Sequence, residues 1–559
     1  MANPLMNLAF QAFAQRSTAR LIQHVQQIEQ AQETFLRSLL QSHQDTEFGR
    51  EHKLSEIKTI DQFRLRLPIR PYSAFAPYIQ RMAHGEANVL VPDPLIYFNI
   101  SSGSTGQKKF IPVTARSRRF LSRSSRTAIG FAIKAALRDQ RPLGKILFPM
   151  SVNPHGQTAS GISYAPVSTS DMYLMDGLSR NLLFVHPPEA YQIADTTARY
   201  YICLMFALRD PNLRVILATF PILALQMCRQ LEEHADSLIQ DIEVGQIADW
   251  IKLEPQLRER LERKWSAAPR RAAQLRQIYQ SYGRLTPQTA WSGLSLMVTA
   301  RAGTSNFYFE QFPEYFGDLP IFGGIYACSE GNLGVHYDFN TDNAIPAIES
   351  TLIEFVPEDQ WETDCPKTLM AWELEVGRRY RIVLTNYSGF YRYDLGDVVE
   401  IEGFFEQAPL MRFLHRRGGV ISASTEKTTE AHVLATMQQL QKIFQVTLGN
   451  FCITLPKKDL PAYYLVNIEL SPADRLADPE KFLQQFEVIM QSVQKFYAIK
   501  RRDQIAPPRL RILPSGSFEI LRQRMIQRGI SAAQIKFPHV TEDRQWLDGL
   551  SIEQEVRLE

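Results

Sequence analysis

The spacing of hydrophobic side chains changes several times along this chain of 559 residues. Apolar residues recur mostly three or four positions apart over residues 6–42, which predicts one or two amphipathic helices. Residues 114–137 predict another helix, and this one carries several arginines, which suit either a solvated face or an anion-facing surface. Residues 144–187 alternate short apolar runs with Gly, Ser and Pro, a pattern that predicts strands and loops of a mixed sheet.

Helical patterns dominate residues 190–265, and a run at 215–220 interrupts them and predicts a buried strand. Five short apolar runs further along return the chain to sheet, at residues 294–299, 320–326, 351–356, 380–385 and 398–401. Helices and strands therefore alternate along the chain, which predicts the α/β class.

The pattern changes again after residue 411, where Arg412-Phe-Leu-His-Arg-Arg-Gly-Gly places two glycines behind basic residues. Such a stretch suits a hinge, which we place near 412–417. A chain of this length also exceeds the size at which one core stops growing. The sequence thus predicts a large N-terminal domain over 1–411, with mixed sheets flanked by helices, and a small α+β C-terminal domain over 418–559.

Composition narrows the class of protein. Hydrophobic residues make up 45% and charged residues 22%, as in globular proteins. The formal charge of +3, from 62 basic and 59 acidic residues, argues against a dedicated nucleic-acid binder. Five scattered cysteines, no secretory signal and no apolar run of about 20 residues predict a cytoplasmic protein without a membrane partner. No obvious dimerisation segment is present, so we expect a monomer.

One stretch carries candidate chemistry, the Ser- and Gly-rich loop between Asn99 and Pro112. It lies between two apolar segments, which predicts a strand, a tight loop and a second strand or turn. Backbone N–H groups, hydroxyls and lysines there suit a polyphosphate. The glycine spacing does not match a Walker A loop, and Phe110 follows Lys109. Taken alone, the stretch is equally consistent with a polar surface turn.

Two further stretches have similar character, Y-A-C-S-E-G at 326–331 and Y-R-Y-D-L-G-D at 391–397. Glu330 in the first could hold Mg²⁺, and Asp397 in the second could accept both hydroxyls of a ribose. Together with the loop, they predict a site for a nucleoside triphosphate.

The order of these motifs resembles that of adenylate-forming enzymes. The pattern S-S-G-[ST]-[ST]-G-x-x-K, then Y-A-x-S-E-G, then Y-x-x-G-D, is similar to that of the auxin-responsive-promoter family of acyl-acid amido synthetases, which join carboxylate hormones to amino acids in plants. Matching stretches extend from about residue 95 to residue 540 and include 385–389, 408–413, 424–430 and 528–538.

The resemblance implies a role for each matching residue. Phosphate binding would fall to Ser101, Ser102, Gly103, Ser104, Thr105, Gly106 and Lys109. The α-phosphate would be lined by Tyr326, Ala327, Cys328, Ser329 and Glu330. Glu330 would also hold Mg²⁺, and Asp397 would bind the ribose. Two lysines of a rotating C-terminal domain would act in turn, Lys536 in adenylation and Lys427 in the second step.

The implied activity is ATP-dependent adenylation of a small carboxylic acid, with Mg²⁺, followed by transfer of the acyl group to an amino acid amine. Two alternatives stay open, an acyl-CoA ligase that uses the same adenylate and a non-catalytic nucleotide-binding protein. The chain departs from the family pattern at Asp394, where Arg is usual, and at Cys328, where Ser is common. Residues 160–176 and 306–309, in the acyl-pocket region, match no particular substrate, so the acid, the amine and the general base are unassigned.

Overall fold

The structure is a computed structural model that describes residues 4–558, except for 103–107, 153, 155, 168–171, 173, 176, 304, 310, 362, 417–418, 460, 472–473 and 528–536. It separates into two compact units. The first comprises Met1–Ser101 and Phe110–Leu414, and the second comprises Ser102–Lys109 and His415–Glu559. Within the described part of the chain, no helix is long and apolar enough to cross a bilayer.

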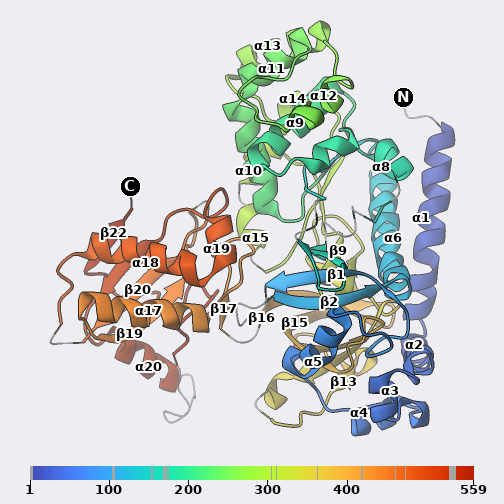
Figure 1. Cartoon of the computed structure of the whole chain (residues 1–559), viewed down its shortest axis with the longest axis vertical. Coiled ribbons are helices and arrows are strands. Elements are labelled where there is room, and N and C mark those ends of the chain that lie inside the picture. The colour runs from blue at the N-terminus through green and yellow to red at the C-terminus, as the bar shows by residue number, and fades with distance from the viewer. Residues whose placement is uncertain are drawn as a thin grey trace. The chain divides into compact units, whose positions relative to one another are not determined.

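The first unit begins with two helices, α1 (Pro4–Val25) and α2 (Ile28–His43), as the amphipathic pattern predicts. Figure 1 shows α1 running beside α6 (Ala115–Arg138). The two helices approach closely at Gly130, where a Cβ would lie 2.3 Å from Ser17 Oγ. The Thr127 hydroxyl donates a hydrogen bond to the Ser17 carbonyl at 3.1 Å. Small residues on α6 thus allow the two helices to pack closely.

The largest sheet has eight strands in the order β13-β12-β14-β15-β16-β11-β10-β9. Its central strands are buried and apolar, and β12 pairs with β14 antiparallel from Thr351↔Asn386 to Pro357↔Tyr380. The strand bounds are β9 (Ile325–Cys328), β10 (Gly331–His336), β11 (Asn343–Pro346), β12 (Thr351–Pro357), β13 (Leu369–Met370), β14 (Arg379–Asn386), β15 (Tyr393–Phe405) and β16 (Ala408–Arg416).

Two four-stranded sheets also lie in the described part of this unit, in the orders β2-β1-β5-β4 and β3-β6-β7-β8. The second sheet is parallel throughout. The bounds are β1 (Leu95–Ser102), β2 (Lys108–Thr114), β3 (Ile146–Leu147), β4 (Gly156–Gln157), β5 (Ser163–Ala165), β6 (Val215–Leu217), β7 (Leu296–Val298) and β8 (Ile321–Phe322). The alternation of strands and helices confirms the predicted α/β class.

The expectation of strands and loops throughout residues 144–187 is wrong at one place. The apolar run at 182–185 begins in helix α8 (Gly177–Leu183). Leu182 is 63% exposed, so it does not contribute to a sheet interior, and only Phe184 forms a bridge with Ile146. The other helices of the unit are α3 (Glu47–Glu51), η1 (Leu54–Glu56), α4 (Ile60–Arg66), α5 (Tyr72–Ala83), η2 (Pro188–Gln192), α9 (Thr196–Arg209), α10 (Pro221–Glu233), α11 (Ala235–Val244), α12 (Pro255–Glu262), α13 (Pro269–Tyr282), α14 (Pro287–Ala290), α15 (Ser305–Phe309), α16 (Phe312–Phe316), η3 (Glu358–Gln360) and η4 (Ala371–Glu373).

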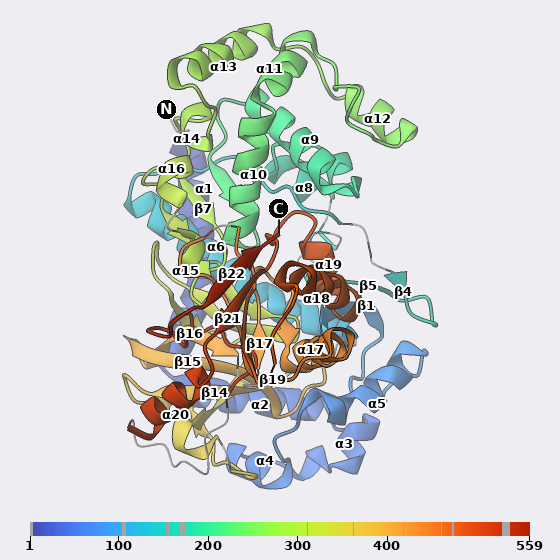
Figure 2. The same cartoon turned by 90° about the vertical axis from the view of Figure 1, so that its left-hand side faces the viewer.

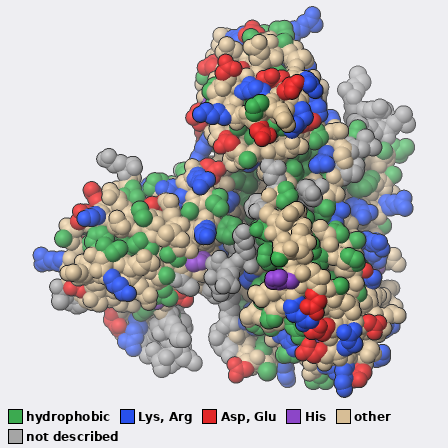
Figure 3. Space-filling view, in the orientation of Figure 1, with side chains coloured by type: hydrophobic (Ala, Val, Ile, Leu, Met, Phe, Trp, Pro, Cys, Tyr) green, Lys and Arg blue, Asp and Glu red, His purple; other side chains and the backbone are tan. Residues whose placement is uncertain are grey.

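The second unit is built on a four-stranded sheet in the order β19-β20-β21-β22, beside which helices α17 and α18 pack against each other (Figure 2). Strands β20 and β21 are parallel, and the other pairs are antiparallel. Figure 3 shows one face of the whole molecule, on which basic and acidic side chains are interspersed. The bounds are β17 (Val420–Ile421), β18 (Thr428–Thr429), α17 (Glu430–Phe444), β19 (Leu448–Thr454), β20 (Leu465–Leu470), α18 (Pro479–Val493), α19 (Lys495–Lys500), β21 (Arg509–Leu513), α20 (Ser517–Gln527) and β22 (Gln554–Arg557).

Candidate active site

The Ser- and Gly-rich loop joins β1 to β2, so the strands predicted on either side of it are present. Its four central residues, Gly103, Ser104, Thr105 and Gly106, lie outside the described residues, as do the side chains of Ser101 and Ser102. Lys109 is on β2. The assignment of these residues to phosphate binding therefore stays a prediction.

The second stretch forms the hairpin between β9 and β10, in which Cys328 pairs with Gly331. At the turn of the hairpin, the Ser329 hydroxyl donates a hydrogen bond to the Ile100 carbonyl at 3.3 Å. Because Ile100 lies near the end of β1, this bond holds the hairpin beside the start of the Ser- and Gly-rich loop. The structure thus brings two of the predicted stretches together.

Glu330 lies at the same turn and is only 2% exposed. The Tyr393 hydroxyl donates a hydrogen bond to Glu330 Oε1 at 2.9 Å, and Asn386 Nδ2 donates to the Glu330 carbonyl at 2.7 Å. Burial, and then the charge of Glu330, raise the pKa of Tyr72 to about 12, although a hydrogen bond to Phe110 opposes them. A carboxylate this deep is costly unless hydrogen bonds and charge partners offset the lost hydration.

Asp397 lies on β15 and is 7% exposed. The Tyr326 hydroxyl donates a hydrogen bond to Asp397 Oδ2 at 2.9 Å. The third stretch therefore contacts the second twice, through Tyr326 with Asp397 and through Tyr393 with Glu330. The second and third stretches, far apart in the sequence, therefore meet at one place in the first unit, and the Ser329 bond brings Ile100 of β1 beside them.

Comparison with known proteins shows a match along most of the chain. The GH3 family N-terminal domain matches residues 18–321, the central domain matches residues 344–416 and the C-terminal domain matches residues 431–545. The first of these matches alone spans more than half of the sequence. This chain belongs to the GH3 family. The predicted resemblance to auxin-responsive amido synthetases is thereby confirmed.

Two curated relatives illustrate the similarity. The chain is 26% identical over 568 residues to indole-3-acetic acid-amido synthetase GH3.17 of Arabidopsis thaliana, covering 91% of this chain and 90% of the relative. It is 26% identical over 547 residues to indole-3-acetic acid-amido synthetase GH3.8 of Oryza sativa subsp. indica, covering 91% and 88%. Among solved structures, the GH3.15 acyl acid amido synthetase in complex with 2,4-DB matches with a TM-score of 0.65 and 22% identity, covering 97% of both chains. That likeness confirms the fold.

The two departures from the family pattern have distinct surroundings. The Cys328 thiol donates to the Gly331 carbonyl at 3.3 Å, so it closes the hairpin turn as a hydroxyl would. Asp394 accepts a hydrogen bond from Gly396 N at 3.2 Å, and its other oxygen lies 3.5 Å from Arg381 Nη1. Both residues therefore have local partners, and neither displaces Glu330 or Asp397.

Sequence reasoning missed the tyrosine and the asparagine that hold Glu330. Tyr393 is part of the third stretch and Asn386 is part of the matching stretch 385–389, but nothing in the sequence assigns a role to either residue. The two residues occupy facing ends of β14 and β15, where the register pairs Leu384 with Tyr393. This cross-strand register is the signal that would have found them.

The structure describes only one of the two catalytic lysines predicted for the second domain. Lys427 lies between β17 and β18 with a left-handed φ of 51°. Its backbone N–H donates to Ser422 Oγ at 3.0 Å, and its carbonyl accepts from Gln494 Nε2 at 3.1 Å. Lys536 lies outside the described residues. Their roles in the two steps stay predictions.

Proposed function

We propose that this GH3 protein is an acyl-acid amido synthetase that adenylates a small carboxylic acid with ATP and passes the acyl group to an amino acid. The observation that carries the proposal is the pair of contacts by which Tyr393 and Tyr326 hold Glu330 and Asp397. Family membership supports the same activity, since the curated relatives above carry amido synthetase names.

The chemistry follows from the weak electrophilicity of a carboxylate. A carboxylate oxygen of the acid attacks the α-phosphorus of ATP, and pyrophosphate leaves. A neutral amine then attacks the acyl carbon, and AMP leaves with the electrons of the broken C–O bond. In this scheme Asp397 accepts the ribose hydroxyls, and the segment from Tyr326 to Ser329 lies along the α-phosphate. Residues 101–106 and Lys109 hold the remaining phosphates.

Glu330 suits a single-carboxylate magnesium site. Among the residues that the structure describes, no group of three or more His, Cys, Asp or Glu side chains could hold a metal ion. Mg²⁺ in nucleotide sites typically takes one or two carboxylates and completes its shell with phosphate oxygens and water. Glu330, buried at the hairpin turn, fits that requirement. When bound, Mg²⁺ supplies positive charge that offsets charge on the phosphates.

The proposal includes a division of labour between two domains, 1–411 and 418–559, joined by a hinge near 412–417. Rotation of the smaller domain would present Lys536 during adenylation and Lys427 during amide formation, and would shield the mixed anhydride from water. We place the protein in the cytoplasm as a monomer whose partners are small molecules rather than nucleic acid or membrane.

Identification of the products tests this function against its rivals. Purified protein is supplied with a panel of carboxylic acids, ATP and Mg²⁺, together with either the twenty amino acids or coenzyme A, and the products are identified by mass spectrometry. We expect an acyl–amino acid conjugate and AMP. An acyl-CoA thioester without conjugate would establish the ligase alternative instead. ATP binding without acid-dependent turnover would establish a non-catalytic nucleotide-binding protein.

A further inference from the structure

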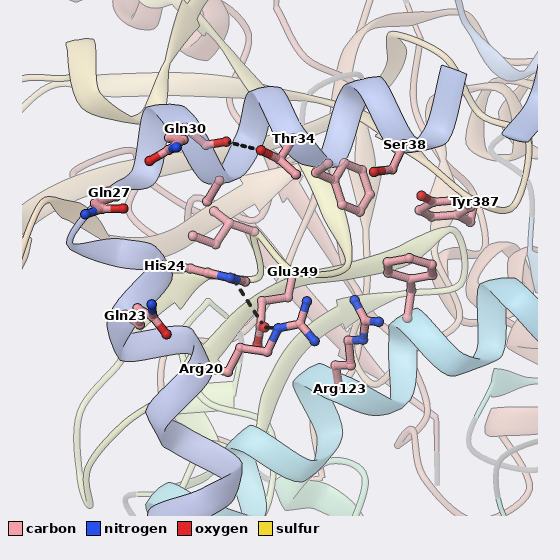
Figure 4. Close-up of a pocket in the computed structure, with 14 residues that line it drawn as sticks. Arg20, Gln23, His24, Gln27, Gln30, Thr34, Ser38, Arg123, Glu349 and Tyr387 are labelled. Carbon is pink, nitrogen blue, oxygen red and sulfur yellow. Dashed lines mark hydrogen bonds and ion pairs between the residues drawn. The ribbon is translucent and has the colours of Figure 1, made fainter. Parts of the chain in front are cut away.

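A pocket separate from the candidate active site lies between α1, α2 and α6 (Figure 4). Its volume is about 410 Å³. A neighbouring cavity of about 390 Å³ shares Ser38, Phe120, Arg123 and Tyr387 with it, and we call the two together the α6 groove. Neither cavity is lined by Glu330 or Asp397. Each is within the range of about 300–1,000 Å³ that small-molecule sites occupy.

The α6 groove carries an excess of positive charge. Four arginines line it, Arg20, Arg116, Arg119 and Arg123, against two carboxylates, Asp93 and Glu349. Arg20 Nε lies 2.8 Å from Glu349 Oε1, and Arg116 Nε lies 2.7 Å from Asp93 Oδ2. These two pairs account for both carboxylates. The lining therefore has a net charge of +2, because four positive charges face two negative ones.

Arg123 is the residue that most needs an anion. Its guanidinium carbon lies 4.2 Å from the centre of the Phe120 ring. Burial, and then the charge of Arg20, lower the pKa of Arg123. Within the described part of the chain it forms no ion pair within 4.0 Å. Figure 4 shows the guanidinium groups of Arg20 and Arg123 turned toward each other across the pocket. An anion placed between them would offset both the lost hydration and the mutual repulsion.

The rest of the wall combines apolar side chains, such as Phe35 and Ile348, with polar ones, among them His24. Gln23, Gln27 and Gln30 line the pocket from α1, α2 and the turn between them, and Ser38 adds a hydroxyl where the two cavities meet. Amide and hydroxyl groups both donate and accept hydrogen bonds, so they suit a ligand with several hydroxyls. Guanidinium groups match the geometry of a phosphate and bind it through paired N–H donors.

We propose that the α6 groove is a binding site for a phosphate monoester with a hydroxylated body, in which Arg119 and Arg123 hold the dianionic phosphate. Arg20 contributes from the opposite wall, and the three glutamines contact the body. This ligand is distinct from the ATP of the proposed reaction, and the site is separate from the residues assigned to that reaction.

Isothermal titration of the full-length protein with ribose 5-phosphate tests the site. We expect binding by the wild type, at least about tenfold weaker binding by Arg119→Ala/Arg123→Ala, and unchanged affinity in Arg126→Ala, an exposed arginine on the same helix. Asp397→Ala should also bind normally, because the groove does not involve the proposed nucleotide site. Free ribose should not bind.

Three results would overturn the proposal. They are no binding by the wild type, equal affinity in Arg119→Ala/Arg123→Ala, and loss of binding in Asp397→Ala. Equal affinity for inorganic phosphate would refute the hydroxylated body. Should the double variant fail to fold, Arg119→Ala provides the test, since Arg119 is exposed and its replacement removes one phosphate donor only. Unchanged affinity there would contradict the role of Arg119.

Discussion

At the scale of single residues, the Tyr393 hydroxyl has the most specific role, because it donates to a buried carboxylate. We predict that Tyr393→Phe lowers acid-dependent ATP–pyrophosphate exchange about ten- to a hundredfold, since a hydrogen bond to a charged group contributes about 1.5–3 kcal/mol. The matched control is Tyr380→Phe, which removes a buried hydroxyl that accepts a hydrogen bond from Glu375 N at 3.1 Å. Equal exchange rates in the two variants would contradict this role.

The sequence predicted Glu330 and Asp397 but not the side chains that hold them. Acidic residues next to Gly, Ser and Tyr in a motif similar to that of the family can be recognised from the sequence alone. The contacts Tyr393–Glu330 and Tyr326–Asp397 span 63 and 71 positions and depend on sheet register, which spacing alone does not give. Cys328 could be recognised as a departure, whereas its bond to Gly331 required the structure.

At the scale of elements, the β9–β10 hairpin depends on a glycine that follows Glu330. A Cβ at Gly331 would lie 2.8 Å from Asn386 Nδ2, the atom that holds the Glu330 carbonyl. We predict that Gly331→Ala displaces that amide and lowers pyrophosphate exchange at least about tenfold, because such a contact forces neighbouring atoms to move. Gly403→Ala is the control, since the nearest atom there is 3.9 Å away. Full activity of Gly331→Ala would refute this reasoning.

The connection from β14 to β15 is held by an ion pair in the protein interior. Arg392 Nη2 lies 2.9 Å from Glu354 Oε1, and Arg392 Nη1 donates to the carbonyls of Arg64 and Leu67 at 2.8 and 2.7 Å. Glu354 is 1% exposed. We predict that Arg392→Met lowers the free energy of unfolding by about 3–5 kcal/mol, because it leaves a buried carboxylate without its main partner.

A double variant tests whether the stability is lost because one charge is buried without its partner. Arg392→Met/Glu354→Leu should recover part of the lost stability, since neither charge is then buried alone. Thermal melting followed by circular dichroism measures all three proteins. A double variant no more stable than Arg392→Met would contradict the explanation.

Periodicity predicted the long elements well, because helices such as α2 and α6 display an apolar face over several turns. It failed at α8, where a run of four apolar residues is compatible with either a strand or a helix end. Burial decides between the two, and Leu182 and Leu183 remain largely exposed. Short apolar runs therefore carry the least information about this fold.

At the scale of the whole molecule, buried histidines couple stability to pH. Burial lowers the pKa of His43, His186 and His336 to about 4. The unfolded chain, in which histidine has a pKa of about 6.5, takes up protons first as the pH falls. As the pH falls from 6.5 to 4, each histidine therefore lowers the free energy of unfolding by up to about 1.4 kcal/mol per pH unit. Above pH 6.5 it adds no further pH dependence.

We accordingly predict a lower melting temperature at pH 5 than at pH 7, with a smaller difference in His186→Gln. In the wild type, Phe148 N donates to His186 Nε2 at 3.4 Å, and a glutamine oxygen can accept there without titrating. His84→Gln, at an exposed position, should keep the wild-type difference. An identical pH dependence in all three proteins would contradict the assignment.

The division into two domains was predicted from two glycines and a change of pattern, and the boundary at 412–417 is still a prediction. The structure extends β16 to Arg416, with Arg412 paired to Glu400 at 3.3 Å. The sequence indicates where the chain can bend. The rotation proposed for catalysis depends instead on the relative stability of two arrangements of the domains.

Acid-dependent exchange of labelled pyrophosphate into ATP tests the central claim most directly, namely that the three stretches form an adenylation site. The wild type is assayed with a panel of carboxylic acids, beside Asp397→Ala and the exposed control Asp61→Ala. We predict exchange that requires an acid, is lost by at least about a hundredfold in Asp397→Ala and is unchanged in Asp61→Ala. Acid-dependent exchange at the wild-type rate in Asp397→Ala would contradict the account.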